Sequence, residues 1–219
     1  MPESTTNAAL LTERFERAFR LACELHRHDL RKSTTVPYLA HLMSVAALVL
    51  EDGGDEDEAI AALLHDALED HADEITAEEL EERFGARVRE LVEACTDTPP
   101  EYTGGQKPPW RKRKERYIEH VRSWESPNRI SLADKVHNAR SILRDHRRHG
   151  DEVWERFKPT GEQTLWYYRS LVEAYRDAGA DGYLVEELDR VVSVLEARAG
   201  GGARDGRASD ASAYRRAMR

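Results

Sequence analysis

Apolar residues recur at helical spacing along most of this chain. Intervals of three and four positions predict a first amphipathic helix over about Asn7 to Asp29 and a second from Pro37 to about Glu51. Pro37 suits a first helical turn, where its missing N–H costs nothing. The same spacing predicts helices over residues 60–70, 76–85, 86–96, 110–124, 130–143, 152–178 and 182–197. No segment alternates strongly enough to predict a strand, so we expect an all-α fold, a multi-helix bundle.

Capping signals and loop residues divide these helices. Thr76 and Glu79 have the spacing of a capping box, and Gly85 is suited to closing the short helix that follows Thr76. The run DTPPEYTGGQKPP, residues 97–109, is dense in Pro and Gly and predicts a loop. The last residues, GGGARDGRASDASAYRRAMR, have no periodic apolar face. We therefore expect one domain over residues 1–198 and a disordered C-terminal tail over residues 199–219.

Charge and cysteine content narrow the functional class. The 219 residues carry a formal net charge of −9, which argues against general binding to nucleic acid or anionic membranes. No apolar run approaches the ~18 residues of a membrane span, and the first residues lack the pattern of a signal peptide. Cys23 and Cys95 have no partner spacing typical of a zinc site and are interpreted as reduced thiols. These features predict a soluble cytoplasmic protein, and they leave its oligomeric state open.

The stretch IAALLHDALED, residues 60–70, gathers polar groups on one helical face. On an ideal helix, one wedge of roughly 140° holds four of its side chains, namely His65, Asp66, Glu69 and Asp70. The opposite side is apolar, with Ile60, Leu64, Ala67 and Leu68. Such a face has two interpretations: a surface that water solvates, or a site where His65 and Asp66 bind a metal ion and the two later carboxylates handle water.

Two further residues favour the metal site. His41 lies near the start of the helix that begins at Pro37, and Asp134 lies inside the apolar run SLADKVH. Together with His65 and Asp66 they supply two imidazoles and two carboxylates, a set that suits Mn²⁺ or another divalent first-row ion with coordination positions left for water or substrate. An unpaired carboxylate beside a core is costly, so Asp134 needs a partner. The alternative interpretation is a cap or a salt bridge to Lys135 or Arg140.

The series PYLAH, LLHDALED and SLADKVHN resembles the HD-domain metal-dependent phosphohydrolases, and within them the RelA/SpoT-type hydrolases that remove pyrophosphate from the alarmone (p)ppGpp. The resemblance covers about residues 10–175 and implies an HD-domain helical bundle. It leaves no room for the synthetase domain of the long enzymes, so the chain looks like a free-standing small alarmone hydrolase.

The resemblance implies roles for individual residues. The metal ligands would be His41, His65, Asp66 and Asp134. The acidic pair that activates the attacking water would be Glu69 and Asp70. Substrate contacts would come from Arg31 over the guanine base, Asn138 near the ribose and phosphates, Lys32 and Thr34 at the pocket rim, and Tyr168. Tyr167 is an alternative to Tyr168, and a second alternative is that both tyrosines are core residues.

The chain departs from the family pattern at a few positions. Ser33 and Thr35 replace residues that are often small, which bears on the guanine preference. His71 follows the acidic pair where the family often has Thr, and Lys135 stands in place of a common Arg, which keeps the charge but loses the fork geometry. The histidines outside the three motifs are interpreted as surface or packing residues: His26, His28, His71, His120, His137, His146 and His149.

The basic run from Arg111 to Arg116 also has two interpretations. It is either a solvated helix face with Glu115 and Glu119 as partners, or a source of cations for the substrate's phosphates.

The expected activity is a Mn²⁺-dependent hydrolysis of the 3′-pyrophosphate of ppGpp or pppGpp, giving GDP or GTP and pyrophosphate. Two alternatives remain at this point. The enzyme could act on another nucleotide, such as a nucleoside monophosphate or NADPH. The chain could instead be a nucleotide-sensing module without turnover, although the complete set of ligands together with Glu69 and Asp70 argues against that.

Overall fold

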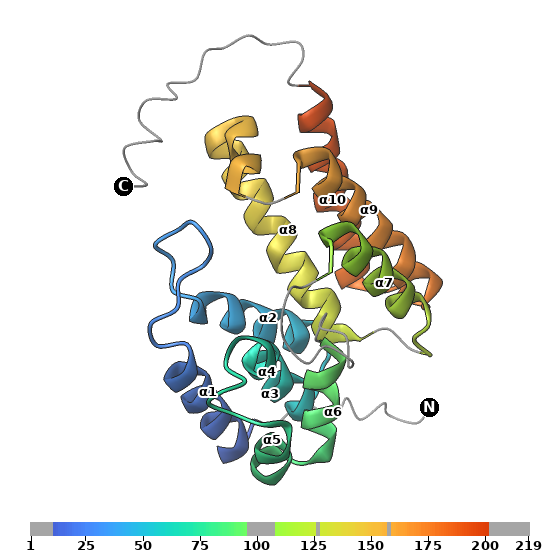
Figure 1. Ribbon diagram of the computed structural model, residues 1–219. Coiled ribbons are helices and arrows are strands. Elements are labelled where there is room, and N and C mark those ends of the chain that lie inside the picture. Colours follow the sequence, from blue (N-terminus) through green and yellow to red (C-terminus); the bar gives the residue numbers. More distant parts are fainter. Residues whose placement is uncertain (1–10, 96–107, 126–127, 157–158, 202–219) are drawn as a thin grey trace. The chain divides into compact units, whose positions relative to one another are not determined.

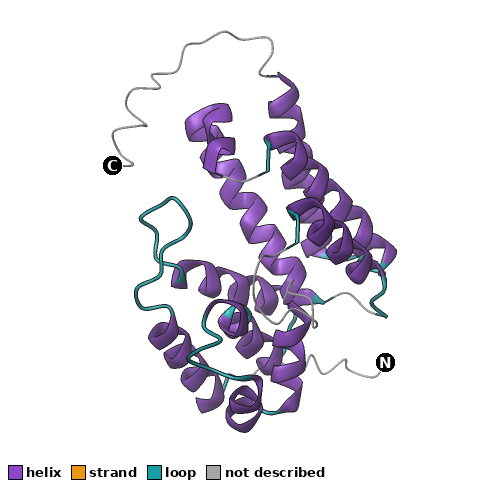
Figure 2. Ribbon diagram, viewed as in Figure 1, coloured by secondary structure: helices purple, strands orange, loops and turns teal. Residues whose placement is uncertain are grey.

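The structure is a computed structural model, and it describes residues 11–95, 108–125, 128–156 and 159–201. Within these ranges every regular element is a helix (Figure 2), which confirms the all-α prediction. The elements are α1 (Glu13–Leu25), α2 (Leu39–Glu51), α3 (Glu56–Leu64), α4 (Ala67–Asp70), α5 (Ala77–Phe84), α6 (Ala86–Cys95), α7 (Trp110–Arg122), α8 (Arg129–His149), the 3₁₀ helix η1 (Gly150–Arg156), α9 (Gly161–Asp177) and α10 (Tyr183–Gly201). Among them, no helix has the length and apolar character that a membrane crossing requires.

The described residues form two compact units. The first contains residues 11–29, 37–95 and 128–133, and the second contains residues 30–36, 108–125, 134–156 and 159–201. The predicted single domain over residues 1–198 is not tested by this division and stays a prediction.

Helix α3 is the centre of the first unit. It contacts α1, α2 and α6 (Figure 1), and its residues from Ala59 to Leu64 are at most 1% exposed. A helix that is apolar on all sides is stable only when neighbours cover every side of it. The apolar side predicted for this segment, which includes Ile60 and Leu64, is therefore buried in α3.

Ion pairs hold the polar start of α3 against its surroundings. The Arg14 guanidinium bonds Asp57 at 2.7 Å, and Arg129 bonds Asp52 at 2.9 Å and Glu58 at 2.6 Å. These bonds connect segments far apart in the sequence, and they surround the acidic first turn of α3. The polar start of α3 is therefore held by ion pairs, and its apolar end, which precedes His65, is held by burial in the core.

In the second unit, α9 packs against α7 and α10. Arg169 of α9 bonds Asp189 at 2.5 Å and Glu196 at 2.6 Å on α10, so a half-buried ion cluster joins the two helices. On α7, Arg111 bonds Glu115 at 2.7 Å and both side chains are about half exposed. The Arg111–Glu115 pair agrees with the interpretation of residues 111–116 as a solvated helix face. The other expected partner, Glu119, pairs with Arg122, which lies outside that basic run.

The predicted ends of the first and last helices were wrong. The first helix ends at Leu25, four residues before Asp29, and the residues before Leu11 lie outside the described ranges. The C-terminal helix continues to Gly201, so its last three residues fall in the predicted tail. The rest of that tail, like most of the predicted loop at residues 97–109, lies outside the described residues.

The predicted helix over residues 152–178 is in fact two elements. The 3₁₀ helix η1 ends at Arg156, and α9 begins only at Gly161 after a capping box between Thr160 and Gln163. Pro159 disfavours a helical conformation in the residue before it. Gly161 is also required, because a Cβ there would lie 2.9 Å from the Trp154 ring.

The predicted capping box at the start of α5 is confirmed. Thr76 Oγ accepts a bond from the Glu79 amide, and the Glu79 carboxylate accepts one from the Thr76 amide. Gly85 closes the helix with a φ of 94°, a backbone conformation that favours glycine.

Because Thr76 is exposed, Thr76→Ala removes the cap without disturbing the core. We expect it to lower the free energy of unfolding by about 1 kcal/mol, measured by urea denaturation. Thr35→Ala is the matched control, since Thr35 is exposed and lies at no helix start. Equal stability of the two variants would contradict the capping role.

Candidate metal centre

A break between two helices positions the central His-Asp pair. The sequence predicted one continuous helix over residues 60–70, but α3 ends at Leu64 and α4 starts at Ala67. Between them, Asp66 has a φ of −99° and a ψ of −3°, outside regular helical geometry. The break therefore replaces the predicted single polar face with a turn that carries His65 and Asp66.

The His65 ring and the Asp66 carboxylate face each other across this turn. His65 Nδ1 lies 2.8 Å from the Ala62 carbonyl oxygen, which can only accept, so Nδ1 carries the hydrogen. In the neutral ring, Nε2 then presents a lone pair, and it lies 3.0 Å from Asp66 Oδ2. Two lone pairs at this distance repel each other unless a cation, either a proton or a metal ion, lies between them. The residues therefore fit a metal ion, and the Ala62 contact is the kind of outer hydrogen bond that orients a ligating histidine.

His41 and Tyr38, from the start of α2, complete this group in the first unit. His41 is 1% exposed, and its Nε2 lies 3.8 Å from Asp66 Oδ2. The Tyr38 hydroxyl donates a hydrogen bond of 2.6 Å to the same oxygen. The ligand atoms of His41, His65 and Asp66 all lie within 4.8 Å of one another, so three of the four predicted metal ligands come together.

Helix α4 holds Glu69 and Asp70 one turn after Asp66. The Asp66 carbonyl accepts both of their amide protons, at 3.1 Å and 2.9 Å. Burial of part of the carboxyl group, together with the negative charges of Asp66 and Glu69, raises the pKa of Asp70 to about 6. A carboxyl group with such a pKa can take up and release a proton near neutral pH.

The fourth predicted ligand, Asp134, belongs to the second unit. There its carboxylate accepts hydrogen bonds from Lys135, at 2.6 Å, and from Asn138. The salt bridge to Lys135 is one of the two alternatives expected from the sequence, whereas Arg140 pairs with Glu187. The role of Asp134 as a metal ligand stays a prediction.

The predicted base-binding residue Arg31 joins this chain of polar contacts. Its guanidinium donates a hydrogen bond of 2.5 Å to Asn138 Oδ1, so Arg31, Asn138 and Asp134 lie in sequence along one network. Lys135 is 15% exposed. Burial would lower the pKa of its ammonium, but the Asp134 charge outweighs this effect and raises that pKa. The Lys135 ammonium therefore remains charged at neutral pH.

The other predicted substrate residues have different surroundings. Thr34 Oγ1 donates a 2.8 Å bond to the Arg31 carbonyl and so shapes the loop that carries Arg31, while Lys32 is exposed. Tyr168 is 7% exposed, and burial followed by the Asp134 charge raises the pKa of its hydroxyl. Tyr167 is equally buried, so exposure does not distinguish the two tyrosines.

Sequence reasoning missed Tyr38. It precedes His41 by three residues at a helix start, a spacing that places the two side chains on the same side, and their rings are 5.5 Å apart. That spacing was the available signal for Tyr38. His26 and His71 were interpreted as surface or packing residues, but they form a polar cluster with Asp29 that is taken up below.

Comparison with known proteins places the chain in a family. The HD domain family model matches residues 18–158. The guanosine-3′,5′-bis(diphosphate) 3′-pyrophosphohydrolase MESH1 of Xenopus tropicalis is 36% identical over 144 residues, 64% of this chain and 73% of that protein. The enzyme of the same activity from Aquifex aeolicus is 48% identical over 84 residues, 38% of this chain, and the match spans only 12% of that protein's length.

A solved structure shares the arrangement of the chain. The structure described for a metazoan ortholog of SpoT that hydrolyzes ppGpp aligns with a TM-score of 0.65 and 26% sequence identity. The alignment covers 85% of this chain and 98% of that one.

Removing the Tyr38 hydroxyl tests its contact with Asp66. We expect Tyr38→Phe to weaken Mn²⁺ binding by about 10- to 100-fold, because Asp66 Oδ2 loses the donor that orients it. Calorimetric titration of chelator-stripped protein measures this affinity. Tyr183→Phe, at an exposed tyrosine of the second unit, is the control, and an affinity equal in both variants would contradict the assignment.

Proposed function

The chain belongs to the HD domain family, and we propose that it is a metal-dependent pyrophosphohydrolase that converts ppGpp or pppGpp to GDP or GTP and pyrophosphate. The observation that carries this proposal is the grouping of His41, His65 and Asp66, in a chain that spans 73% of a relative with this activity. The proposal concerns hydrolysis of the 3′-pyrophosphate by water.

The metal would be held by His41, His65 and Asp66, with Asp134 as a fourth ligand. Mixed imidazole and carboxylate donors with positions left for water suit Mn²⁺, which we propose as the ion. When bound, such an ion acts as a Lewis acid on a phosphoryl oxygen and acidifies water. The Ala62 carbonyl and the Tyr38 hydroxyl keep the donor atoms of His65 and Asp66 oriented before any ligand arrives.

Glu69 and Asp70 are the proposed proton-handling groups. Both lie on α4, tied through their amides to the Asp66 carbonyl, so they stay one turn from the metal ligands. They would orient the attacking water and accept its proton. A pKa of about 6 lets Asp70 be ionised at neutral pH and still accept a proton readily.

The substrate's charge and base would be recognised by cations of the second unit. The Arg31 guanidinium is planar and can stack on a guanine ring, which a lysine ammonium cannot do. Its bond to Asn138 Oδ1 holds one edge of that plane. We propose Asn138 and Lys32 as contacts to ribose and phosphate, and Tyr168 as part of the pocket wall.

A substrate panel tests the activity. We expect Mn²⁺-loaded protein to release pyrophosphate from ppGpp and pppGpp, but little or no phosphate from nucleoside monophosphates or NADPH. Asp66→Ala should lower kcat/KM by about three orders of magnitude, equal to about 4 kcal/mol, because it removes a ligand. EDTA should have the same effect on the wild type.

Two outcomes of this panel would contradict the proposal. If ppGpp yields no pyrophosphate while a known hydrolase succeeds in parallel, the substrate is wrong. Tight ppGpp binding without turnover under any divalent ion would identify a sensing module instead.

Separate variants test the two carboxylates of α4. We expect Glu69→Gln and Asp70→Asn to lower kcat by about 10²- to 10⁴-fold, the usual contribution of a positioned acid or base. Their Mn²⁺ affinity should stay within a few-fold of wild type, because neither is a proposed ligand. Glu78→Gln, at an exposed position on α5, is the control. If either site variant loses the metal instead, that residue is a ligand rather than a base.

A further inference from the structure

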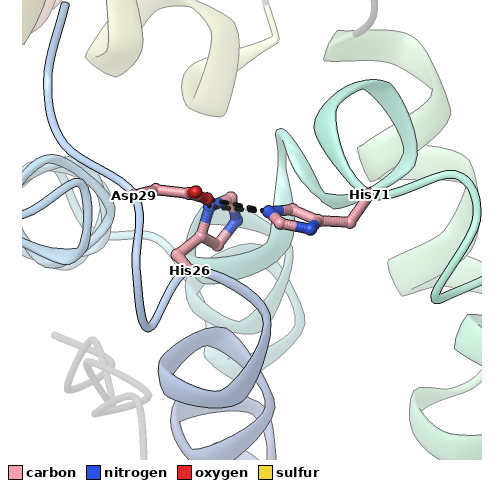
Figure 3. A group of neighbouring side chains, drawn as sticks. All are labelled: His26, Asp29 and His71. Atoms are coloured by element: carbon pink, nitrogen blue, oxygen red, sulfur yellow. Dashed lines mark hydrogen bonds and ion pairs between the residues drawn. The ribbon is translucent and has the colours of Figure 1, made fainter.

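A second group of side chains with the donor atoms to hold a metal ion lies in the first unit, apart from His41, His65 and Asp66. It consists of His26, which caps the end of α1, Asp29 in the following turn, and His71, which caps the end of α4. Figure 3 shows the three side chains converging, with dashed lines between their polar atoms.

The distances within this group fit the coordination of a single ion. Asp29 Oδ2 lies 2.9 Å from His26 Nδ1 and 2.9 Å from His71 Nε2, and the two nitrogens are 3.3 Å apart. Three donors at about 2.1 Å from one ion, at angles between octahedral and tetrahedral values, lie roughly 3.0 to 3.4 Å from one another. The observed triangle is close to that range on all three sides.

Without a metal ion, the two imidazoles share one acceptor, Asp29 Oδ2. Each imidazole can bond Asp29 Oδ2 only by donating a proton, so both nitrogens would point hydrogens at one oxygen from 3.3 Å apart. His71 would also need a second proton, because its Nδ1 lies 2.8 Å from Glu74 Oε1. A divalent cation at the centre would replace both N–H bonds, since both nitrogens then present lone pairs and His26 carries its hydrogen on the buried Nε2.

The surroundings of the group resemble an outer coordination sphere. Glu74 accepts the other N–H of His71, the carboxylate partner that most metal-ligating histidines have. His26 is buried and stacks on Tyr38 at a centroid distance of 5.1 Å, which fixes its ring plane. The Asp29 side chain is 38% exposed, so the group is open to water on that side.

We propose that His26, Asp29 and His71 form a second metal site, selective for a first-row divalent ion of the Zn²⁺ type. Two imidazole nitrogens and one carboxylate oxygen favour such an ion over Mg²⁺ or Ca²⁺, and water would fill the remaining positions. The site does not depend on the proposed activity. Tyr38 nevertheless contacts both sites, because its ring stacks on His26 and its hydroxyl donates a hydrogen bond to Asp66.

Metal stoichiometry tests the proposal on the full chain. Chelator-stripped protein is dialysed against Zn²⁺ buffered by a competing chelator, and bound zinc is counted by mass spectrometry. We expect two ions per wild-type chain, one in Asp66→Ala, one in His71→Ala, and none in the double variant. The d–d absorption of bound Co²⁺ should likewise lose one component in each single variant.

The controls separate ligand loss from misfolding and from surface binding. His28→Ala removes an exposed histidine between His26 and Asp29 and should keep two ions. Asp29→Asn keeps the size of that side chain and should lose one ion. Circular dichroism checks that each variant remains helical.

The results also distinguish the two centres. One ion in the wild type that is lost in Asp66→Ala and kept in His71→Ala would overturn the second site and leave a protonated His71 between Asp29 and Glu74. One ion that is lost in His71→Ala and kept in Asp66→Ala would support the second site and contradict the first.

Discussion

The proposed metal centre in the first unit depends on the contact between His65 Nε2 and Asp66 Oδ2. A tautomer fixed by the Ala62 carbonyl turns a lone pair toward a carboxylate oxygen at 3.0 Å. A cation between the two atoms makes this arrangement favourable, and a rigid frame keeps both donor atoms in place. The frame is α3, whose buried residues contact three other helices and whose acidic first turn is held by Arg14 and Arg129.

At the break after α3, Asp66 makes contacts through both its side chain and its backbone. The Tyr38 hydroxyl bonds Asp66 Oδ2 at 2.6 Å. The Asp66 carbonyl starts a new turn by accepting hydrogen bonds from the amides of Glu69 and Asp70. The Asp66 side chain therefore lies beside the two histidines, while its carbonyl begins the turn that carries Glu69 and Asp70.

The sequence predicted those features that local spacing controls. Helical periodicity located most helices, the Thr76–Glu79 capping box was correct, and three of the predicted ligands lie together. The break at Asp66 was not predictable, because the apolar period continues through Ala67 and Tyr38, the hydrogen-bond partner of Asp66, lies 28 residues away. By contrast, Pro159 and the Thr160–Gln163 box were visible in the sequence, and the interruption before α9 should have been predicted from them. The cluster of His26 with His71 joins positions 45 residues apart, for which periodicity gives no signal.

Lys135 shows how a departure from the family pattern fits its own surroundings. Its ammonium lies 2.6 Å from Asp134 and 5.1 Å from the centre of the Tyr117 ring, in a pocket where the side chain is 15% exposed. A compact ammonium is satisfied by one carboxylate oxygen and an aromatic face, whereas a guanidinium would bring five N–H donors into the same space. The other oxygen of Asp134 accepts from Asn138, which in turn accepts from Arg31. The lysine thus neutralises Asp134 with one donor and leaves the rest of the network to Asn138 and Arg31, the residues proposed to meet the nucleotide.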